Sequence, residues 1–279
     1  MLSNVHRIGF GAMQLPGPGV WGPPADRDEA LAVLRRAVEL GVDHIDTAQF
    51  YGPDVANELI HEALHPYPDD LRIVTKVGAT RGGDRSWIPA VRPEQLRPQV
   101  EDNLRSLEVE RLAAVNLRLP DPGMDGADVP LDEQLGVLAD LRREGKFDGI
   151  GLSNASVEQL ERAAGLVDLA CVQNSYGLLD RDGDPELRWC SARGIPFVPF
   201  FPLGSAFGLT RPTEHATVRA VAARHEATRA QVVLAWLLRR DPVILLIPGT
   251  SKVAHLEENV AARELELTVD DVAELDAIA

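Results

Sequence analysis

The chain has 279 residues, of which 45% are apolar and 25% charged, and its formal net charge is −15. The composition is ordinary for a globular protein, and the negative charge argues against nucleic acid or an anionic membrane surface as a main partner. No apolar run approaches the ~20 residues that a membrane-spanning helix needs, and no signal-peptide pattern opens the sequence. Because Cys171 and Cys190 are the only cysteines, we expect a reducing, cytoplasmic location rather than a disulfide framework.

Eight short β-branched or apolar runs alternate with amphipathic helical patterns along the chain. The predicted strands span residues 6–11, 42–47, 72–77, 112–119, 148–153, 169–174, 195–200 and 243–249. The predicted helices span residues 26–41, 57–65, 93–107, 131–145, 156–165, 184–194, 231–240, 254–262 and 269–279. The first helix shows its limits best, since Asp26 can cap it, Glu29 lies three residues on, and Gly41 follows its end.

Strands that alternate with helices indicate a parallel β/α architecture. The even repeat and the lack of a dinucleotide fingerprint favour a single-domain (β/α)8 TIM barrel over residues 1–279, rather than an open doubly wound sheet. In such a barrel the chemically active side chains lie at the carboxyl ends of the strands. Residues 78–92 and 120–130, rich in Gly, Pro and Asp, are predicted to be long loops over that end.

Three side chains near predicted strand ends form a candidate proton-donating group. Asp46 lies at the end of one strand, Tyr51 follows five residues later, and Lys76 lies at the end of the next strand. We expect the Lys76 cation to lower the pKa of the Tyr51 phenol, and Asp46 to keep Lys76 charged. Such a group can protonate a carbonyl oxygen while a hydride arrives at the carbonyl carbon.

Two other motifs are interpreted as structural. HEALH at 61–65 matches a zinc-hydrolase pattern, but Pro66 ends the helix, no persuasive third ligand follows, and this helix end faces away from the strand ends. We therefore predict no metal site. GFGAMQ at 9–14 begins like a phosphate-binding glycine loop, yet Gln14 stands where the third glycine belongs, so this segment is interpreted as the first strand and its turn.

Taken together, these segments resemble the aldo-keto reductase family over essentially the whole chain. The resemblance is carried, in order, by DHIDTAQFYG (43–52), Lys76, GLSN (151–154), VQN (172–174), FFPLG (200–204) and IPGTSKVAHLEEN (247–259). It implies a barrel that binds NADPH, in preference to NADH, across the carboxyl face of its strands. It also implies reversible hydride transfer between the nicotinamide and a small carbonyl substrate or alcohol, without metal or flavin.

The resemblance implies roles for individual residues. Tyr51 corresponds to the general acid, with Lys76 and Asp46 as its partners, and Phe200 to the ring that stacks on the nicotinamide. The implied cofactor contacts are Ala12, Met13, Asp46, Ser153, Asn154, Gln173, Phe200, Phe201, Leu203, Gly204, Ser205, Gly249, Thr250, Ser251, Lys252, His255, Glu258 and Asn259. Lys252 is the candidate contact for the 2′-phosphate that distinguishes NADPH, and His255 stands where the family commonly has arginine.

The sequence departs from the family at the fourth predicted strand, which reads VNLRLP. Arg118 stands where the family has its fourth catalytic residue, usually a histidine. An arginine is always charged, so it can polarise a carbonyl oxygen but cannot relay a proton. We therefore expect Arg118 to orient the carbonyl and Tyr51 to deliver the proton.

The segments at 12–24 and 198–204 are similar to those of a bacterial branch associated with reduction of pyridoxal to pyridoxine, so pyridoxal is an expected substrate. Tyr51 and Arg118, together with Trp21 and Trp87 from predicted mouth loops, are the expected substrate-pocket residues. An alternative is an NADPH-binding regulatory or sensor protein with little turnover. The missing histidine favours this alternative, and the intact Asp46, Tyr51 and Lys76 disfavour it. The sequence indicates no particular oligomeric state.

Overall fold

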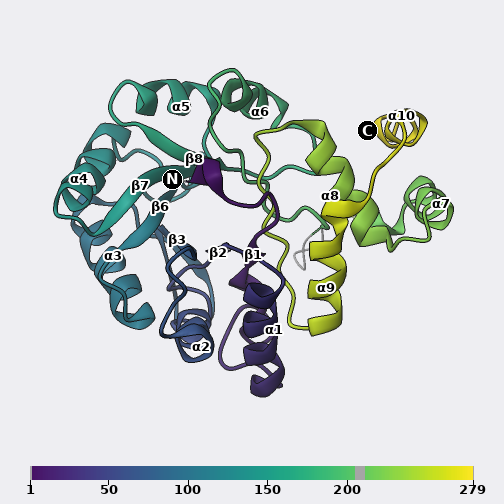
Figure 1. Ribbon diagram of the computed structural model, residues 1–279. Helices are drawn as coiled ribbons and strands as arrows, with labels where there is room; N and C mark the ends of the chain where they lie inside the picture. Colours follow the sequence, from purple (N-terminus) through teal and green to yellow (C-terminus); the bar gives the residue numbers. More distant parts are fainter. Residues whose placement is uncertain (1, 205–210, 279) are drawn as a thin grey trace.

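The computed structural model describes residues 2–204 and 211–278. Six parallel strands form one curved sheet in the order β1–β2–β3–β6–β7–β8, with helices around its outside (Figure 1). The strands are β1 (Phe10–Gly11), β2 (His44–Asp46), β3 (Arg72–Val77), β6 (Leu112–Arg118), β7 (Phe147–Ser153) and β8 (Leu169–Gln173).

Two further segments close the ring between β8 and β1. Phe197 pairs in parallel with Val172 on one side and with Ile244 on the other, and Leu246 pairs with Ile8. Backbone hydrogen bonds of 2.7–2.9 Å accompany all three junctions. These segments occupy the remaining two strand positions, so the predicted (β/α)8 barrel is confirmed.

The closing segments are less regular than the predicted strands 195–200 and 243–249. Pro196, Pro199 and Pro248 have no backbone N–H and cannot donate to a ladder, so the segments appear as isolated pairings rather than continuous strands.

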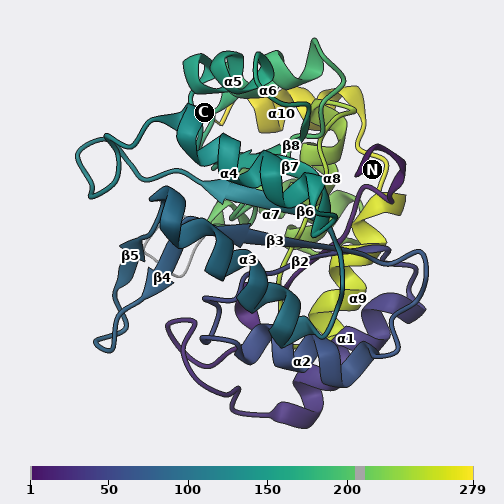
Figure 2. The ribbon, with the colours of Figure 1, turned by 90° about the vertical axis from the view of Figure 1, so that its left-hand side faces the viewer.

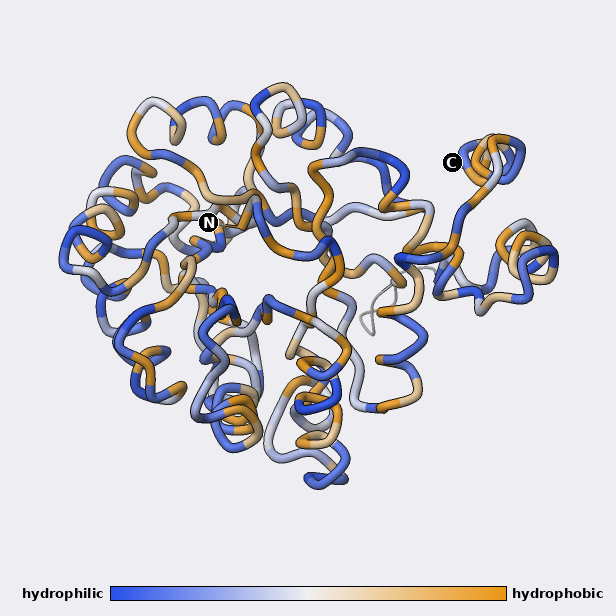
Figure 3. The backbone as a smooth tube through the Cα atoms, viewed as in Figure 1, coloured by the Kyte–Doolittle hydropathy of each residue, from blue (hydrophilic) through white to orange (hydrophobic). Residues whose placement is uncertain are grey.

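The helices match the predicted helices to within a few residues. They are α1 (Arg27–Glu39), α2 (Val55–Leu64), α3 (Pro93–Leu107), α4 (Leu131–Arg143), α5 (Val157–Ala164), α6 (Asp184–Ser191), α8 (Arg229–Arg240), α9 (Val253–Ala261) and α10 (Val269–Asp276). Figure 3 shows that polar and apolar residues alternate along them, as a helix with one buried face requires. Asp26 caps α1 as predicted, since its side chain accepts a hydrogen bond of 2.9 Å from Glu29 N.

A hairpin of two strands and one α-helix were not predicted. Residues 78–92 were expected to be a loop, but β4 (Ala79–Arg81) and β5 (Trp87–Pro89) form an antiparallel hairpin that projects from the barrel (Figure 2). Its strands are too short and too exposed to show a period-2 hydrophobic pattern. Helix α7 (Ala216–Arg224) was missed because its apolar stripe contains only Val218, Val221 and the small Ala222 in its buried positions.

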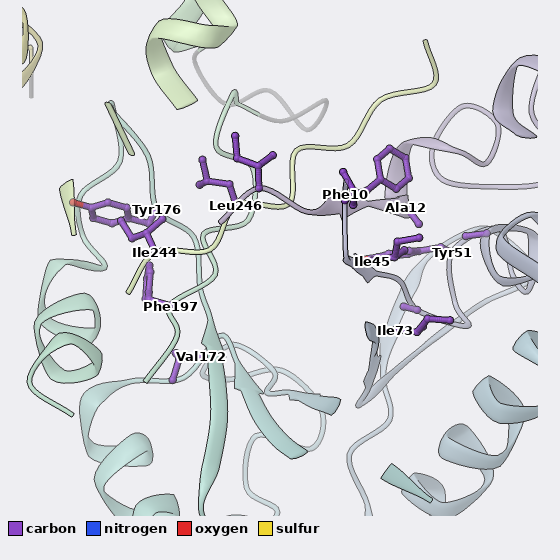
Figure 4. Close-up of a cluster of buried hydrophobic side chains, with 14 of the residues drawn as sticks. Phe10, Ala12, Ile45, Tyr51, Ile73, Val172, Tyr176, Phe197, Ile244 and Leu246 are labelled. Atoms are coloured by element: carbon purple, nitrogen blue, oxygen red, sulfur yellow. The ribbon is translucent and has the colours of Figure 1, made fainter. Parts of the chain in front are cut away.

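The two faces of each strand have different functions. Outward residues such as Ile45, Val172 and Phe197 pack beneath the helices (Figure 4). Inward residues form a second cluster in the barrel interior, consisting of Val74, Ala114, Cys171, Val198, Leu245 and Ile247 together with Leu2. Because side chains alternate along a strand, Lys76 follows Val74 inward, and Gln173 follows Cys171. This alternation brings polar side chains from different strands to the carboxyl end of the barrel.

A buried polar network holds the ends of β2 and β3 against two helices. Asn57 of α2 accepts a hydrogen bond of 2.8 Å from Thr47 Oγ1 and donates to Asn103 Oδ1 at 3.1 Å. Asn103 of α3 also accepts from Thr75 Oγ1. Thr47 follows Asp46 and Thr75 precedes Lys76, so the network fixes the backbone next to both candidate catalytic side chains.

No helix in residues 2–204 and 211–278 is long and apolar enough to cross a membrane.

Substituting Asn57→Ala should leave the buried Thr47 hydroxyl without its acceptor, at a cost of about 1–3 kcal/mol, and should remove one of the two donors to Asn103 Oδ1. We expect a lower free energy of unfolding in urea and a reduced kcat, because the ends of β2 and β3 lose their support. Glu58→Ala, an exposed neighbour on α2, is the matched control and should change stability by less than about 0.5 kcal/mol. Equal effects of the two substitutions would contradict this role of the network.

Candidate active site

Asp46 and Lys76 form a buried ion pair at the carboxyl ends of β2 and β3. Lys76 Nζ donates to Asp46 Oδ1 and to the backbone oxygen of Thr47 at 3.3 Å, and Gln173 Nε2 donates to Asp46 Oδ2 at 2.9 Å. The side chains of Lys76 and Asp46 are only 7% and 6% exposed. Burial acts to lower the pKa of Lys76, but the negative charge of Asp46 outweighs it, so this pKa is raised. Lys76 is therefore a cation at neutral pH.

Tyr51 lies in the turn after β2, beside this ion pair. Its ring centroid is 5.1 Å from Lys76 Nζ, and the residue is 6% exposed. Burial raises the pKa of the Tyr51 phenol above its ordinary value, and the opposing charges of Lys76 and Arg118 do not cancel that effect. The expectation of a lowered Tyr51 pKa was therefore wrong, because desolvation outweighs the cations. The phenol keeps its proton at neutral pH, as a general acid must before it reacts.

Arg118 ends β6 and contributes to the same cavity as Tyr51 and Lys76. Two residues earlier, Asn116 is fully buried and accepts a hydrogen bond of 3.2 Å from Cys171 Sγ. Gly151 makes room for it, since a Cβ at Gly151 would lie only 1.9 Å from Asn116 Oδ1. Asn116 thus belongs to the barrel interior, and Arg118 is the polar side chain that β6 presents to the cavity.

The cavity at the carboxyl end has a volume of about 370 Å³. The predicted residues that line it are Met13, Asp46, Tyr51, Lys76, Trp87, Arg118, Ser153, Gln173, Phe200, Phe201, Leu203, Gly204 and Gly249. The sequence interpretation missed further lining residues, namely Gly11, Gln14, Phe50, Pro202, Ile247 and Pro248. Phe50 could have been suspected, because it directly precedes Tyr51.

The remaining predicted residues lie elsewhere. The predicted residues that do not line the cavity are Ala12, Trp21, Asn154, Thr250, Ser251, Lys252, His255, Glu258 and Asn259. Ser205 falls outside the described residues. Asn154 is turned away from it, since its Nδ2 donates to Asp121 Oδ1 at 2.9 Å and to Leu119 O at 3.1 Å. The structure therefore brings Ser153 and Gln173 together in the cavity, without Asn154.

Two buried oxygen atoms that belong to cavity-lining residues have no hydrogen-bond partner in the described part of the chain. They are Ser153 Oγ and Gln173 Oε1, on neighbouring strands β7 and β8. A buried polar atom without a partner is costly, and these two offer one hydroxyl and one carbonyl acceptor. An amide group of a ligand, which has both a donor and an acceptor, would satisfy them.

Aromatic rings form one wall of the cavity. Phe50 packs edge-on against Tyr51 and Trp87, with ring centroids 5.3 and 5.7 Å away. The guanidinium carbon of Arg81 lies 4.1 Å from the centroid of Trp87 and 5.1 Å from that of Trp21. Trp21 therefore stands behind Arg81 rather than in the cavity, and it contributes to the wall by holding Arg81 against Trp87.

The segment after Gly249 leads away from the cavity to the start of α9. Lys252 Nζ lies 3.3 Å from Glu29 Oε2, and the other carboxylate oxygen of Glu29 accepts a hydrogen bond of 3.2 Å from Val253 N. A carboxylate from α1 thus occupies the position beside both Lys252 and the amino end of α9. His255 is exposed and Asn259 is buried.

The HEALH segment makes other contacts. Glu62 pairs with Arg27, and His61 Nε2 lies 3.6 Å from Glu108 Oε1. In the described ranges, no three or more His, Cys, Asp or Glu side chains are arranged to hold a metal ion.

The geometry is that of a barrel with a buried acid, lysine and tyrosine at its carboxyl end, and comparison with known proteins agrees with it. The model of the aldo/keto reductase family matches residues 7–279. The chain belongs to the aldo/keto reductase family. It is therefore an NAD(P)H-dependent oxidoreductase.

Individual relatives cover nearly the whole chain. Pyridoxine 4-dehydrogenase of Escherichia coli (strain K12) is 50% identical over 276 residues, which are 99% of this chain and 95% of that protein. An aldo/keto reductase of Klebsiella pneumoniae solved in complex with NADP and acetate superimposes with a TM-score of 0.82 and 26% identity, covering 98% and 91% of the two chains. A Klebsiella pneumoniae aldo-keto reductase in complex with NADPH gives 0.82 and 27% identity, with the same coverage.

Substituting Lys76→Met should leave Asp46 as a buried charge without its cation, which costs about 3–5 kcal/mol of stability. The double variant Asp46→Asn/Lys76→Met removes both charges and should recover most of that loss in urea unfolding. Both variants should lose activity, because neither has the Lys76 cation that favours the Tyr51 phenolate. The pKa of Tyr51 should rise further, so any residual activity should persist to higher pH. A double variant no more stable than Lys76→Met would contradict this account of the pair.

Proposed function

We propose that this aldo-keto reductase uses NADPH to reduce aldehydes and ketones to alcohols, with Tyr51 as the general acid. The observation that carries the proposal is the buried Asp46–Lys76 pair beside a protonated tyrosine in an aromatic-walled cavity. Lysine stabilises the phenolate that forms when Tyr51 gives up its proton, and Asp46 keeps the lysine charged.

The chain's residues suit a nicotinamide amide at the base of the cavity. Ser153 Oγ and Gln173 Oε1 are the unpaired buried atoms that would hold it, and Phe200 and Leu203 supply apolar surface above the strands. The chemistry that NADPH supplies when bound is a hydride for the carbonyl carbon. Tyr51 gives its phenolic proton to the carbonyl oxygen, and Arg118 adds positive charge in the same cavity to stabilise that oxygen as negative charge develops.

Pyridoxal is the first specific substrate that we propose. Its flat aromatic ring suits a cavity walled by Phe50, Tyr51 and Trp87, and the 50% identical Escherichia coli protein is a pyridoxine 4-dehydrogenase. We infer that the only partner this function requires is a small carbonyl compound. We also propose a cytoplasmic location, which the free, buried thiols of Cys171 and Cys190 support.

We further propose that Lys252 contacts the 2′-phosphate of NADPH and that Glu29 competes for the same place. Lys252 is half exposed and lies on the approach to α9, whose amino end favours negative charge. Glu29 already supplies a carboxylate to both groups. A phosphate must therefore displace Glu29, which weakens the preference for NADPH over NADH.

The reductase activity can be tested by following the absorbance of reduced nicotinamide with pyridoxal and with 4-nitrobenzaldehyde. We expect pyridoxal to react faster, and Tyr51→Phe to lower kcat by about 10²–10⁴-fold, the usual contribution of a general acid. NADPH binding, measured by fluorescence, should survive in Tyr51→Phe. If pyridoxal were reduced no faster than 4-nitrobenzaldehyde, the substrate proposal would be contradicted. Tight NADPH binding without turnover of any aldehyde would instead favour the sensor function.

Substituting Glu29→Gln should tighten NADPH binding by about two- to fivefold, the equivalent of one exposed ion pair, and leave NADH binding unchanged. The matched control is Glu39→Gln, which removes the same charge from the other end of α1, where Glu39 pairs with Arg36 at 3.1 Å. Equal tightening by both variants would show a general charge effect and contradict competition at Lys252.

A further inference from the structure

Arg118 carries a positive charge that nothing else in the described chain neutralises. Its side chain makes no hydrogen bond and no ion pair within residues 2–204 and 211–278, although it is half-buried at the cavity. Buried or half-buried arginines elsewhere are paired; Arg7, for example, donates to three backbone oxygens at 2.6–3.0 Å. A guanidinium has five N–H donors and stays charged at every pH of interest, so in Arg118 all five are open to a ligand or to water as far as the described residues are concerned.

The charges that line the cavity do not balance. Among the described residues that line it, Lys76 and Arg118 are the cations and Asp46 is the only carboxylate. Both oxygens of Asp46 are occupied, one by Lys76 and the other by Gln173. The cavity therefore holds one uncompensated positive charge in a chain whose net charge is −15. A site of that kind selects a negatively charged ligand against the overall charge of the protein.

The walls limit the shape of such a ligand. Phe50, Tyr51 and Trp87 present ring edges and faces on one side, so a planar aromatic compound is favoured. Tyr51 must contact the carbonyl oxygen to protonate it. Arg118 lies near enough for its charge to act on the Tyr51 phenol. An anion held by Arg118 therefore lies beside the carbonyl group that Tyr51 protonates.

We propose that Arg118 binds an ionised oxygen on the ring atom next to the carbonyl, so that the preferred substrates are aromatic aldehydes with an ionised ortho-hydroxyl group. This rests on the proposed carbonyl reduction and names its substrate class. Pyridoxal belongs to the class, because its ring hydroxyl is adjacent to its aldehyde. Arg118 is then a specificity-determining residue, beyond any general effect on the carbonyl oxygen.

The test compares 2-hydroxybenzaldehyde with 2-methoxybenzaldehyde, and uses 4-hydroxybenzaldehyde as the positional control. With the wild-type protein and NADPH, kcat/KM should favour the 2-hydroxy compound by about tenfold or more, as expected for a charge-assisted hydrogen bond. This preference should grow as pH rises through the ionisation of the phenol. The 2-methoxy compound cannot ionise and should show no such rise.

Arg118→Met should abolish the preference for the 2-hydroxy compound, whereas Arg118→Lys, which keeps the charge but not the planar fork, should retain part of it. NADPH affinity should be unchanged in both variants, which checks that the fold and the cofactor site survive. If the wild-type protein reduced 2-hydroxybenzaldehyde and 2-methoxybenzaldehyde equally well, this inference would be wrong while the proposed function would stand. The same holds if Arg118→Met lowered kcat/KM equally for the two compounds. A wild-type protein that reduces no aldehyde would overturn the proposed function as well.

Discussion

The buried ion pair between Asp46 and Lys76 is the interaction on which the rest of the site depends. Two charges taken out of water are stable only when every oxygen and N–H group finds a partner. The partners come from different parts of the ring: the Thr47 carbonyl from the end of β2, and the Gln173 amide from β8, 127 residues away from Asp46. Closing the barrel is thus a condition for satisfying the pair, and the site and the fold stabilise each other.

The two cations of the cavity have different surroundings and therefore different tasks. Lys76 is held by a carboxylate and acts on Tyr51, whose burial keeps it protonated. Within residues 2–204 and 211–278, Arg118 is paired with no carboxylate, and it is available to a ligand. An enzyme with two positive groups and one fixed negative group can thus reserve one cation for proton transfer and the other for recognition.

The sequence predicted the parts of this site that depend on strand periodicity. Asp46, Lys76 and Gln173 end apolar runs, and parallel strands bring such ends together without any knowledge of the loops. Contacts decided by loop geometry were not accessible from the sequence. Asn154 directly follows the end of β7, and its amide is directed away from the cavity by its hydrogen bond to Asp121. Trp21 was predicted to be a pocket residue, but it stacks on Arg81 and does not line the cavity. The sign of the Tyr51 pKa shift also required the structure, because burial cannot be read from spacing.

The stacking of Arg81 between two tryptophans has a consequence for how this barrel can diversify. Arg81 belongs to the β4–β5 hairpin, yet it donates to the backbone oxygens of Val20 at 2.8 Å and Gly19 at 3.2 Å. Two loops that are 62 residues apart in the chain are thereby joined into one unit at the rim. A β4–β5 hairpin taken from another barrel would lack the contacts that Arg81 makes with the loop at Gly19 and Val20. Exchanging substrate selectivity between barrels therefore requires replacing both loops together.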